Sequence, residues 1–170
     1  MTNFPIKNDC ASLVRFMALK RNLGFTLIEL LIAISIAAIL MAVAAPSFRD
    51  LVAGQKIKAA SYDVMSALMF TRSEALKRNA NVSLVQATDG WKNGWTVVAA
   101  GPTTLASHDA FTGLDIAGPT SSLVYSRDGR ITSGAGQTFS ISSNVATTVS
   151  GRCITIDLSG LPKSNVGGCS

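Results

Sequence analysis

The chain has 170 residues, of which 48% are hydrophobic and 15% are charged, and its formal net charge is +5. This length allows one domain with a hydrophobic core, but not a large multidomain assembly. Because the sequence holds 1 histidine and 3 cysteines without a Cys-x-x-Cys spacing, we expect neither a metal centre nor a cofactor.

The first 24 residues are polar and hold a large share of the positive charge. Their charged side chains are Lys7, Asp9, Arg15, Lys20 and Arg21, a net charge of +3. The remaining 146 residues carry 11 basic and 9 acidic side chains, a net charge of +2. A basic segment before an apolar one is typical of a cytoplasmic leader, so the basicity is weak evidence for nucleic-acid binding.

Residues 25–45 follow as an apolar segment of 21 residues, and a membrane-spanning helix needs about 20. Its one charged residue is Glu29, which lies four positions after Phe25, and Gly24 directly precedes Phe25. A charge at the centre of a bilayer costs roughly 2.5–3.5 kcal/mol on insertion scales. Because of this cost, an acid within the apolar segment indicates that Glu29 has a functional role.

This order of a basic pair, Gly24, Phe25, Glu29 and an apolar run resembles the N-terminal signal of type IV prepilins and type II secretion pseudopilins. The resemblance implies that prepilin peptidase cuts after Gly24 and that Phe25 becomes N-methylated. It also implies that Glu29 neutralises the N-terminal ammonium of a subunit in the growing filament. Two opposite charges ~4 Å apart attract by ~4 kcal/mol at an effective dielectric of ~20. Such an attraction would turn a costly acid into an assembly contact.

Two simpler interpretations of this segment remain open. One is a secretory signal peptide with an Ala-x-Ala cleavage site at residues 42–44. The other is a plain signal anchor. An h-region usually has ~7–15 residues, which is shorter than this run, and neither interpretation explains Glu29.

The helix is expected to continue beyond Pro46 and to become amphipathic. Proline cannot donate to the carbonyl four residues back and would kink a continuing helix, and the resemblance to pilins favours a kink over a stop. The apolar residues that recur on one side are Leu51, Ile57, Val64, Leu68 and Ala75. Arg72, Glu74, Lys77 and Arg78 are expected to form a solvated face. One helix over 25–79 would be ~82 Å long at ~1.5 Å per residue, too long for a small domain to bury.

After Asn79 the hydrophobic period changes to two, which predicts a β domain. Strands are expected at 81–87, 94–100, 122–126, 137–142, 144–149 and 153–158, turns at 89–90, 127–130 and 133–136, and a loop at 103–119. The predicted fold class is α+β. A leader (1–24), an assembly helix (25–45) and an amphipathic helix (46–79) precede a periplasmic, antiparallel β domain (80–170).

The second half narrows the resemblance to the GspH/FimT family. The similar features are the helix end at 70–79, Trp91-x-x-Gly94-Trp95, Asp128-Gly129-Arg130 and a cysteine-bracketed C-terminal segment. The resemblance implies a pilin-like fold and a minor pilin of the FimU/FimT kind, which primes pilus assembly or sits near the tip. The alternative is an H-type pseudopilin of type II secretion. Partners would then be other pilins, in the inner membrane before assembly and in a pilus or pseudopilus afterwards.

An enzyme is not expected. The sequence has no Gly-x-Ser-x-Gly motif, and His108 beside Asp109 is interpreted as an exposed loop pair rather than a catalytic dyad. Trp91 and Trp95 are interpreted as packing residues rather than a ligand platform. We therefore predict no catalytic residue.

A DNA-binding competence pilin is a further alternative, because some FimT-like pilins bind DNA through a Gly-Arg-type motif near the C-terminus. Here Gly160 is followed by Leu161, where that motif would have arginine. The nearby cations are Arg152 and Lys163. Duplex affinity rises with the number of phosphates neutralised, so two cations would support only a weak DNA contact.

Removal of the leader would remove Cys10 and leave Cys153 and Cys169. Both fall in a segment expected to face the periplasm, where disulfides persist. We therefore expect them to form a disulfide, with two unpaired buried thiols as the alternative. A loop of 15 residues closed in this way contributes ~3 kcal/mol in the chain-entropy model.

Overall fold

The computed structural model describes residues 24–132, 134 and 136–169. The leader residues up to Leu23, including Cys10, and part of the turn predicted at 133–136 lie outside the described residues. The chain divides into two units, with the boundary between Ile39 and Leu40. In the first unit the described residues contribute the beginning of one helix, and the second unit holds the rest of that helix and all of the strands.

Helix α1 spans Leu27–Arg78, which confirms the long helix predicted over 25–79. Thr26 caps its N-terminus, because the Thr26 hydroxyl accepts the Glu29 N–H at 3.2 Å. At the other end Asn79 adopts a left-handed φ of 51°, and the Ala80 N–H donates to the Ala75 carbonyl at 3.2 Å. These are the features of a Schellman C-cap. Pro46 lies inside the helix, so the helix does not stop there, and the kink stays a prediction.

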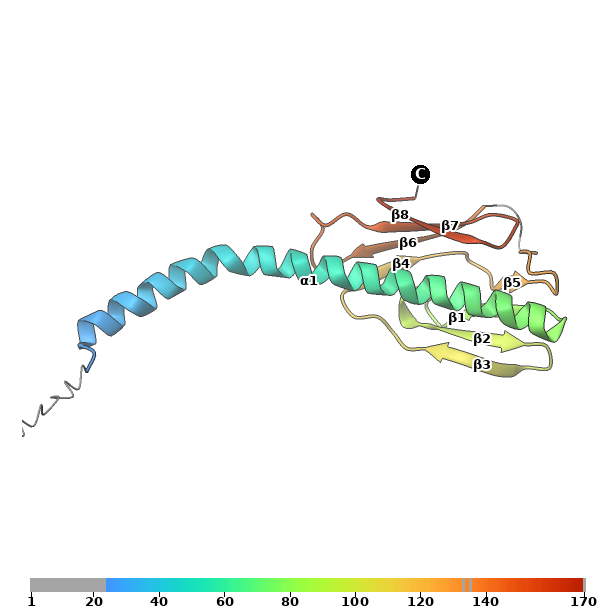
Figure 1. The fold of residues 1–170 in the computed structure, drawn as a ribbon, viewed down its shortest axis with the longest axis horizontal. Coiled ribbons are helices and arrows are strands. Elements are labelled where there is room, and N and C mark those ends of the chain that lie inside the picture. The colour runs from blue at the N-terminus through green and yellow to red at the C-terminus, as the bar shows by residue number, and fades with distance from the viewer. Residues whose placement is uncertain (1–23, 133, 135, 170) are drawn as a thin grey trace, which may run out of the picture. The chain divides into compact units, whose positions relative to one another are not determined.

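The strands form two four-stranded antiparallel sheets (Figure 1). The first has the order β3-β2-β1-β5, with β1 Val82–Gln86, β2 Trp95–Ala99, β3 Thr103–His108 and β5 Leu123–Tyr125. The second has the order β4-β6-β7-β8, with β4 Leu114–Ala117, β6 Gln137–Ser143, β7 Arg152–Ile156 and β8 Pro162–Val166. A short 3-10 helix, η1, spans Trp91–Asn93 between β1 and β2. The predicted α+β class is confirmed.

Two predictions about the β domain are wrong, and one strand was missed. Residues 103–119 are not a loop, because they contain β3 and β4. Residues 144–149 are not a strand, because they form the connection between β6 and β7. Strand β8 was not predicted at all. β3 and β8 are edge strands whose side chains are mostly exposed, so neither shows the apolar alternation by which a strand is predicted.

The core of the second unit lies between α1 and both sheets. Four of the five apolar positions predicted on the helix are buried, from Ile57 at 1% exposed to Leu68 and Ala75 at 0%. The fifth, Leu51, is 60% exposed, which corrects its assignment to the buried side. Opposite the helix, the largest fully buried side chains of the sheets are Tyr125 and Phe139. Within this unit, the buried residues of α1 begin at Ala53.

Candidate assembly site

The predicted cleavage and assembly residues all lie at the exposed start of α1. Phe25, next to Gly24, is 81% exposed, and the apolar side chains of the first helical turns are exposed as well. With Thr26 as the N-cap, Glu29 is in the first turn of the helix. A carboxylate there lies at the positive end of the helix dipole and within one turn of the residue that cleavage would make the N-terminus.

The exposed apolar surface continues into the second unit. Leu40, Met41, Val43 and Phe48 are 64–72% exposed. By length and composition, α1 is the one helix among the described residues that could cross a membrane. Contiguous apolar surface of this kind marks a membrane or protein interaction site.

Polar contacts fasten the second half of α1 to the β domain. Arg72 donates from Nε to the Gly129 carbonyl at 2.9 Å. The hydroxyls of Ser61 and Ser164 lie 3.0 Å apart, and Ser61 is only 2% exposed. Arg72 therefore does not belong to the predicted solvated face. Its side chain instead binds the turn predicted at 127–130.

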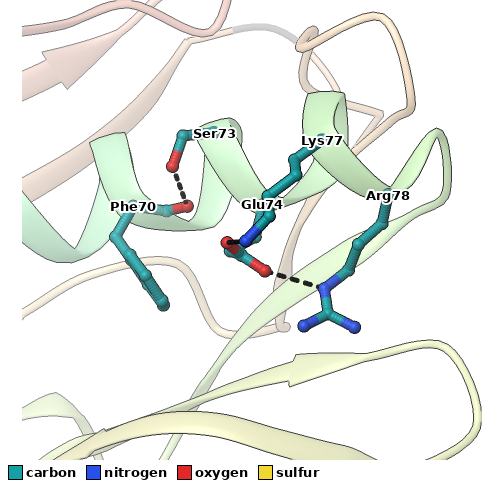
Figure 2. Close-up of polar contacts among 5 residues, drawn as sticks. All are labelled: Phe70, Ser73, Glu74, Lys77 and Arg78. Atoms are coloured by element: carbon teal, nitrogen blue, oxygen red, sulfur yellow. Dashed lines mark hydrogen bonds and ion pairs between the residues drawn. The ribbon is translucent and has the colours of Figure 1, made fainter.

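Figure 2 shows Glu74 joined to Lys77 and Arg78. Glu74 is only 8% exposed, so it does not belong to the predicted solvated face either. Its two carboxylate oxygens accept hydrogen bonds from Arg78 Nε at 2.7 Å and from Lys77 Nζ at 3.3 Å. The Arg78 bond is the main reason that the pKa of Glu74 lies below its usual value. An acid near the C-terminal end of a helix opposes the helix dipole, and these two cations compensate for it.

The tryptophan motif is structural, as expected. Trp91 is 2% exposed, donates from Nε1 to the Pro119 carbonyl at 2.8 Å and packs edge-on against Phe139. Trp95 is 4% exposed and stacks on His108 with ring centroids 4.5 Å apart. The motif thus joins η1 and β2 to the core.

His108 is not part of an exposed loop pair, because it ends β3 and its ring packs against both Trp95 and Phe111, which also contact each other. Its Nδ1 lies 2.7 Å from the backbone oxygen of Asp109, and its Nε2 lies 3.7 Å from a carboxylate oxygen of Asp63. The acid that faces the ring is therefore on α1 rather than next to it in sequence. These contacts give the imidazole a packing role.

The two candidate DNA contacts are not brought together. In the β7–β8 ladder, Arg152 on β7 pairs with Val166, and Lys163 on β8 pairs with Thr155. Thr155 lies three positions after Arg152 on β7. Successive residues of a strand point to opposite faces, so Arg152 and Lys163 lie on different faces of the sheet. Arg152 contacts the Ser164 hydroxyl at 3.4 Å. These two cations cannot form a single phosphate-binding patch.

The tip of the β7–β8 hairpin meets the turn after β5, a contact that sequence analysis missed. The Tyr125 hydroxyl donates to the Gly160 carbonyl at 3.1 Å, and a side chain at Gly160 would collide with the Gly129 carbonyl. The two segments are more than 30 residues apart in sequence, and no local pattern indicates that they touch. This contact places Arg127 and Arg130 on a turn next to the hairpin tip.

Ionisation of Tyr125 makes the free energy of unfolding depend on pH in the alkaline range. Burial raises its pKa from 10.0 to about 12. Because the folded-state pKa is the higher one, its contribution is complete below pH 10 and is lost as the pH rises towards 12. The loss amounts to up to about 3 kcal/mol of the free energy of unfolding. We expect Tyr125→Phe to cost about 1 kcal/mol at pH 8, through the lost hydrogen bond, and to remove this pH dependence.

Chemical denaturation of the mature chain in detergent between pH 8 and 12 would measure the effect. Tyr62→Phe is the matched control, because Tyr62 is 60% exposed. The assignment to Tyr125 is wrong if the two variants lose stability with the same slope above pH 10.

Cys153 and Cys169 form a disulfide, as predicted, with their Cα atoms 5.0 Å apart. The bond ties the segment after β8 back to β7. We expect the double variant with serine at both positions to lose about 3 kcal/mol, and its Tm to fall by on the order of 10 °C. Thermal unfolding with and without a reductant checks this, since the reductant should affect only the wild type. An unchanged Tm in the double variant would contradict it.

Comparison with known proteins places this fold in a family. The family model described as Type II transport protein GspH matches residues 60–160, and the prokaryotic N-terminal methylation motif matches residues 19–45. No curated protein sequence matches the chain.

Solved structures with the same fold include a minor pilin and a minor pseudopilin. Two crystal structures of the type IV minor pilin FimU from Pseudomonas aeruginosa are 23% and 25% identical, with TM-scores of 0.58 and 0.56. They cover 65% and 64% of this chain, and 89% and 91% of their own. The minor pseudopilin EpsH from the Type 2 Secretion System of Vibrio cholerae is 14% identical, with a TM-score of 0.53, and the match covers 65% of this chain and 97% of that one.

The GspH match covers more than half of the chain, and the methylation motif covers the start of the exposed apolar helix. The chain therefore belongs to the GspH family, carries the prokaryotic N-terminal methylation motif and has the fold of a minor pilin and a minor pseudopilin.

Proposed function

We propose that the chain is a minor type IV pilin of the FimU/FimT kind that primes pilus assembly or sits near the pilus tip. In this proposal, prepilin peptidase cleaves between Gly24 and Phe25, and Phe25 is N-methylated. Before assembly, the apolar helix spans the inner membrane once and the β domain faces the periplasm. Within the filament, Glu29 pairs with the N-terminal amine of another subunit.

The observation that carries the proposal is the exposed apolar half of α1 with a single acid in its first turn. Apolar surface of this size must be covered by lipid or by other subunits. Glu29 is then placed where a new N-terminal amine would be held in an environment of low dielectric, in which the attraction of opposite charges is several times stronger than in water.

An H-type pseudopilin of type II secretion remains the alternative. It predicts the same leader, helix and β domain. FimU and EpsH share this fold, and the matching family model carries the name of the secretion protein, so the test below decides between the two. A DNA-binding role gains no support from Arg152 and Lys163, because they lie on opposite faces of one sheet.

The test is intact mass spectrometry of the chain extracted from membranes, combined with detection of the chain in sheared, purified pili. We expect a mass that begins at methylated Phe25 and a chain that copurifies with pili. A chain that begins at Ala45, as a secretory signal peptide would give, overturns the proposal. Correct processing without any chain in pili, but with chain in a secretion pseudopilus, selects the alternative.

A further inference from the structure

An apolar groove lies between α1 and the turn that connects β6 to β7. It has a volume of about 220 Å³. The apolar and small residues that line it are Phe48, Val52, Ala53, Gly113, Val145 and Ala146. Arg49 and Lys56 also border it. The groove belongs entirely to the second unit.

Both walls of the groove are fixed by hydrogen bonds. The Ser143 hydroxyl accepts the backbone N–H groups of Val145 at 3.2 Å and of Ala146 at 3.1 Å, which sets the shape of the turn. The Thr148 hydroxyl donates to Asp50 on α1 at 3.2 Å, so the turn is tied to the helix. A groove that is already formed loses little conformational entropy when a ligand binds.

Large apolar side chains on the two sides of the groove are exposed. Val145 on the turn is 73% exposed, and Phe48 on the helix is 65% exposed. Neither belongs to the core that α1 forms with the sheets. Paired apolar walls that remain open to solvent favour a protein ligand with apolar side chains.

The groove is continuous with the exposed surface of the assembly helix. Leu40, Met41 and Val43 precede Phe48 on α1 and are all exposed, so the apolar stretch ends in the groove. We propose that the groove binds the α1 helix of a neighbouring pilin-type subunit, whose apolar side chains insert between Phe48 and Val145. This inference rests on the proposed function, because it needs the chain to be in a filament.

The chemistry of the groove agrees with this occupant. A whole helix is about 10–12 Å wide, so a groove of this size receives single side chains from a helix lying across it. Side chains spaced three or four residues apart are the anchors in helix-in-groove recognition. The cations Arg49 and Lys56 at the border favour a partner helix that carries a carboxylate beside its apolar face.

The first test compares Val145→Glu with Val166→Glu in the full-length chain, expressed in cells that lack the wild-type copy. Val166 on β8 is 70% exposed, which matches Val145, but it does not line the groove. We expect Val145→Glu to lower the amount of chain in purified filaments at least tenfold. Val166→Glu should leave it unchanged, and both variants should be processed and should accumulate in membranes like the wild type.

Equal incorporation of the two variants overturns the groove proposal while leaving the proposed function intact. A wild-type chain that is absent from filaments overturns both. Because an acid could also disturb folding, a photo-cross-linking amino acid at position 145 gives a second measurement. An adduct that maps to the apolar helix of another pilin-type subunit, including a second copy of this chain, supports the proposal. An adduct with lipid or with a β domain, or no adduct in filaments, overturns it.

Discussion

Replacing Gly94 with alanine is expected to lower the free energy of unfolding by more than about 3 kcal/mol, a large part of the 5–15 kcal/mol typical of a domain. Gly94 has a φ of 100°, which L side chains rarely adopt. A methyl group there would also collide with the backbone carbonyl of His108 and lie 3.0 Å from the carbonyl carbon of Asp109. The neighbouring pair Trp95 and His108 belongs to the β2–β3 ladder, which would have to separate.

Gly90→Ala is the matched control for this prediction. Gly90 has a similar φ of 110°, but nothing lies within 4 Å of an added methyl group. The control should cost only the backbone strain, about 1–3 kcal/mol. Chemical denaturation of both variants gives the difference, which measures the backbone contact alone. Equal losses would show that the close approach of β2 and β3 contributes nothing.

This glycine also shows how far sequence reasoning reaches. The motif Trp91-x-x-Gly94-Trp95 could be recognised as part of a hairpin, and both tryptophans could be assigned to packing. A side chain at position 94 would collide with the backbone of His108, a residue on β3. Because β3 was predicted as a loop, nothing in the sequence could show why this position requires glycine.

The elements that sequence analysis predicted correctly have strong local periodicity. The second half of the long helix and the strands near β1, β2, β5, β6 and β7 have apolar side chains at the period of a buried face, and the first half of the helix is an unbroken apolar run. β8, by contrast, reads Pro-Lys-Ser-Asn-Val and buries little of its surface. Edge strands of this kind are stabilised by backbone pairing with a neighbour, which a single segment does not reveal.

The N-terminal motif and the groove also differ in whether a local sequence pattern indicates them. The order of Gly24, Phe25 and Glu29 is a linear motif, so the sequence shows it directly. The groove between Phe48 and Val145 exists only because the turn after β6 folds against α1, across nearly a hundred positions. Leu51 fits the helical period but is exposed, so the apolar surface of α1 extends further than the membrane segment does, which the sequence pattern does not show.

Glu29→Gln is expected to separate insertion of the chain into the membrane from its assembly into filaments. Glutamine keeps the size of the side chain and removes its charge. Since a charge within a bilayer costs roughly 2.5–3.5 kcal/mol, the variant should insert and be cleaved at least as well as the wild type. It should nevertheless lose the attraction to an N-terminal amine, worth about 4 kcal/mol at ~4 Å and an effective dielectric of ~20.

We therefore expect more than a tenfold lower amount of Glu29→Gln than of wild type in purified filaments, measured at equal amounts of processed chain in membranes. Asp89→Asn is the matched control, because it removes an exposed acid in the turn before η1, outside both the start of α1 and the groove. It should assemble normally. Normal assembly of Glu29→Gln would contradict the amine-pairing role, whatever its membrane level. Reduced cleavage together with reduced assembly would instead assign Glu29 to recognition by the peptidase. Only unimpaired processing followed by failed assembly places the carboxylate at a contact between subunits.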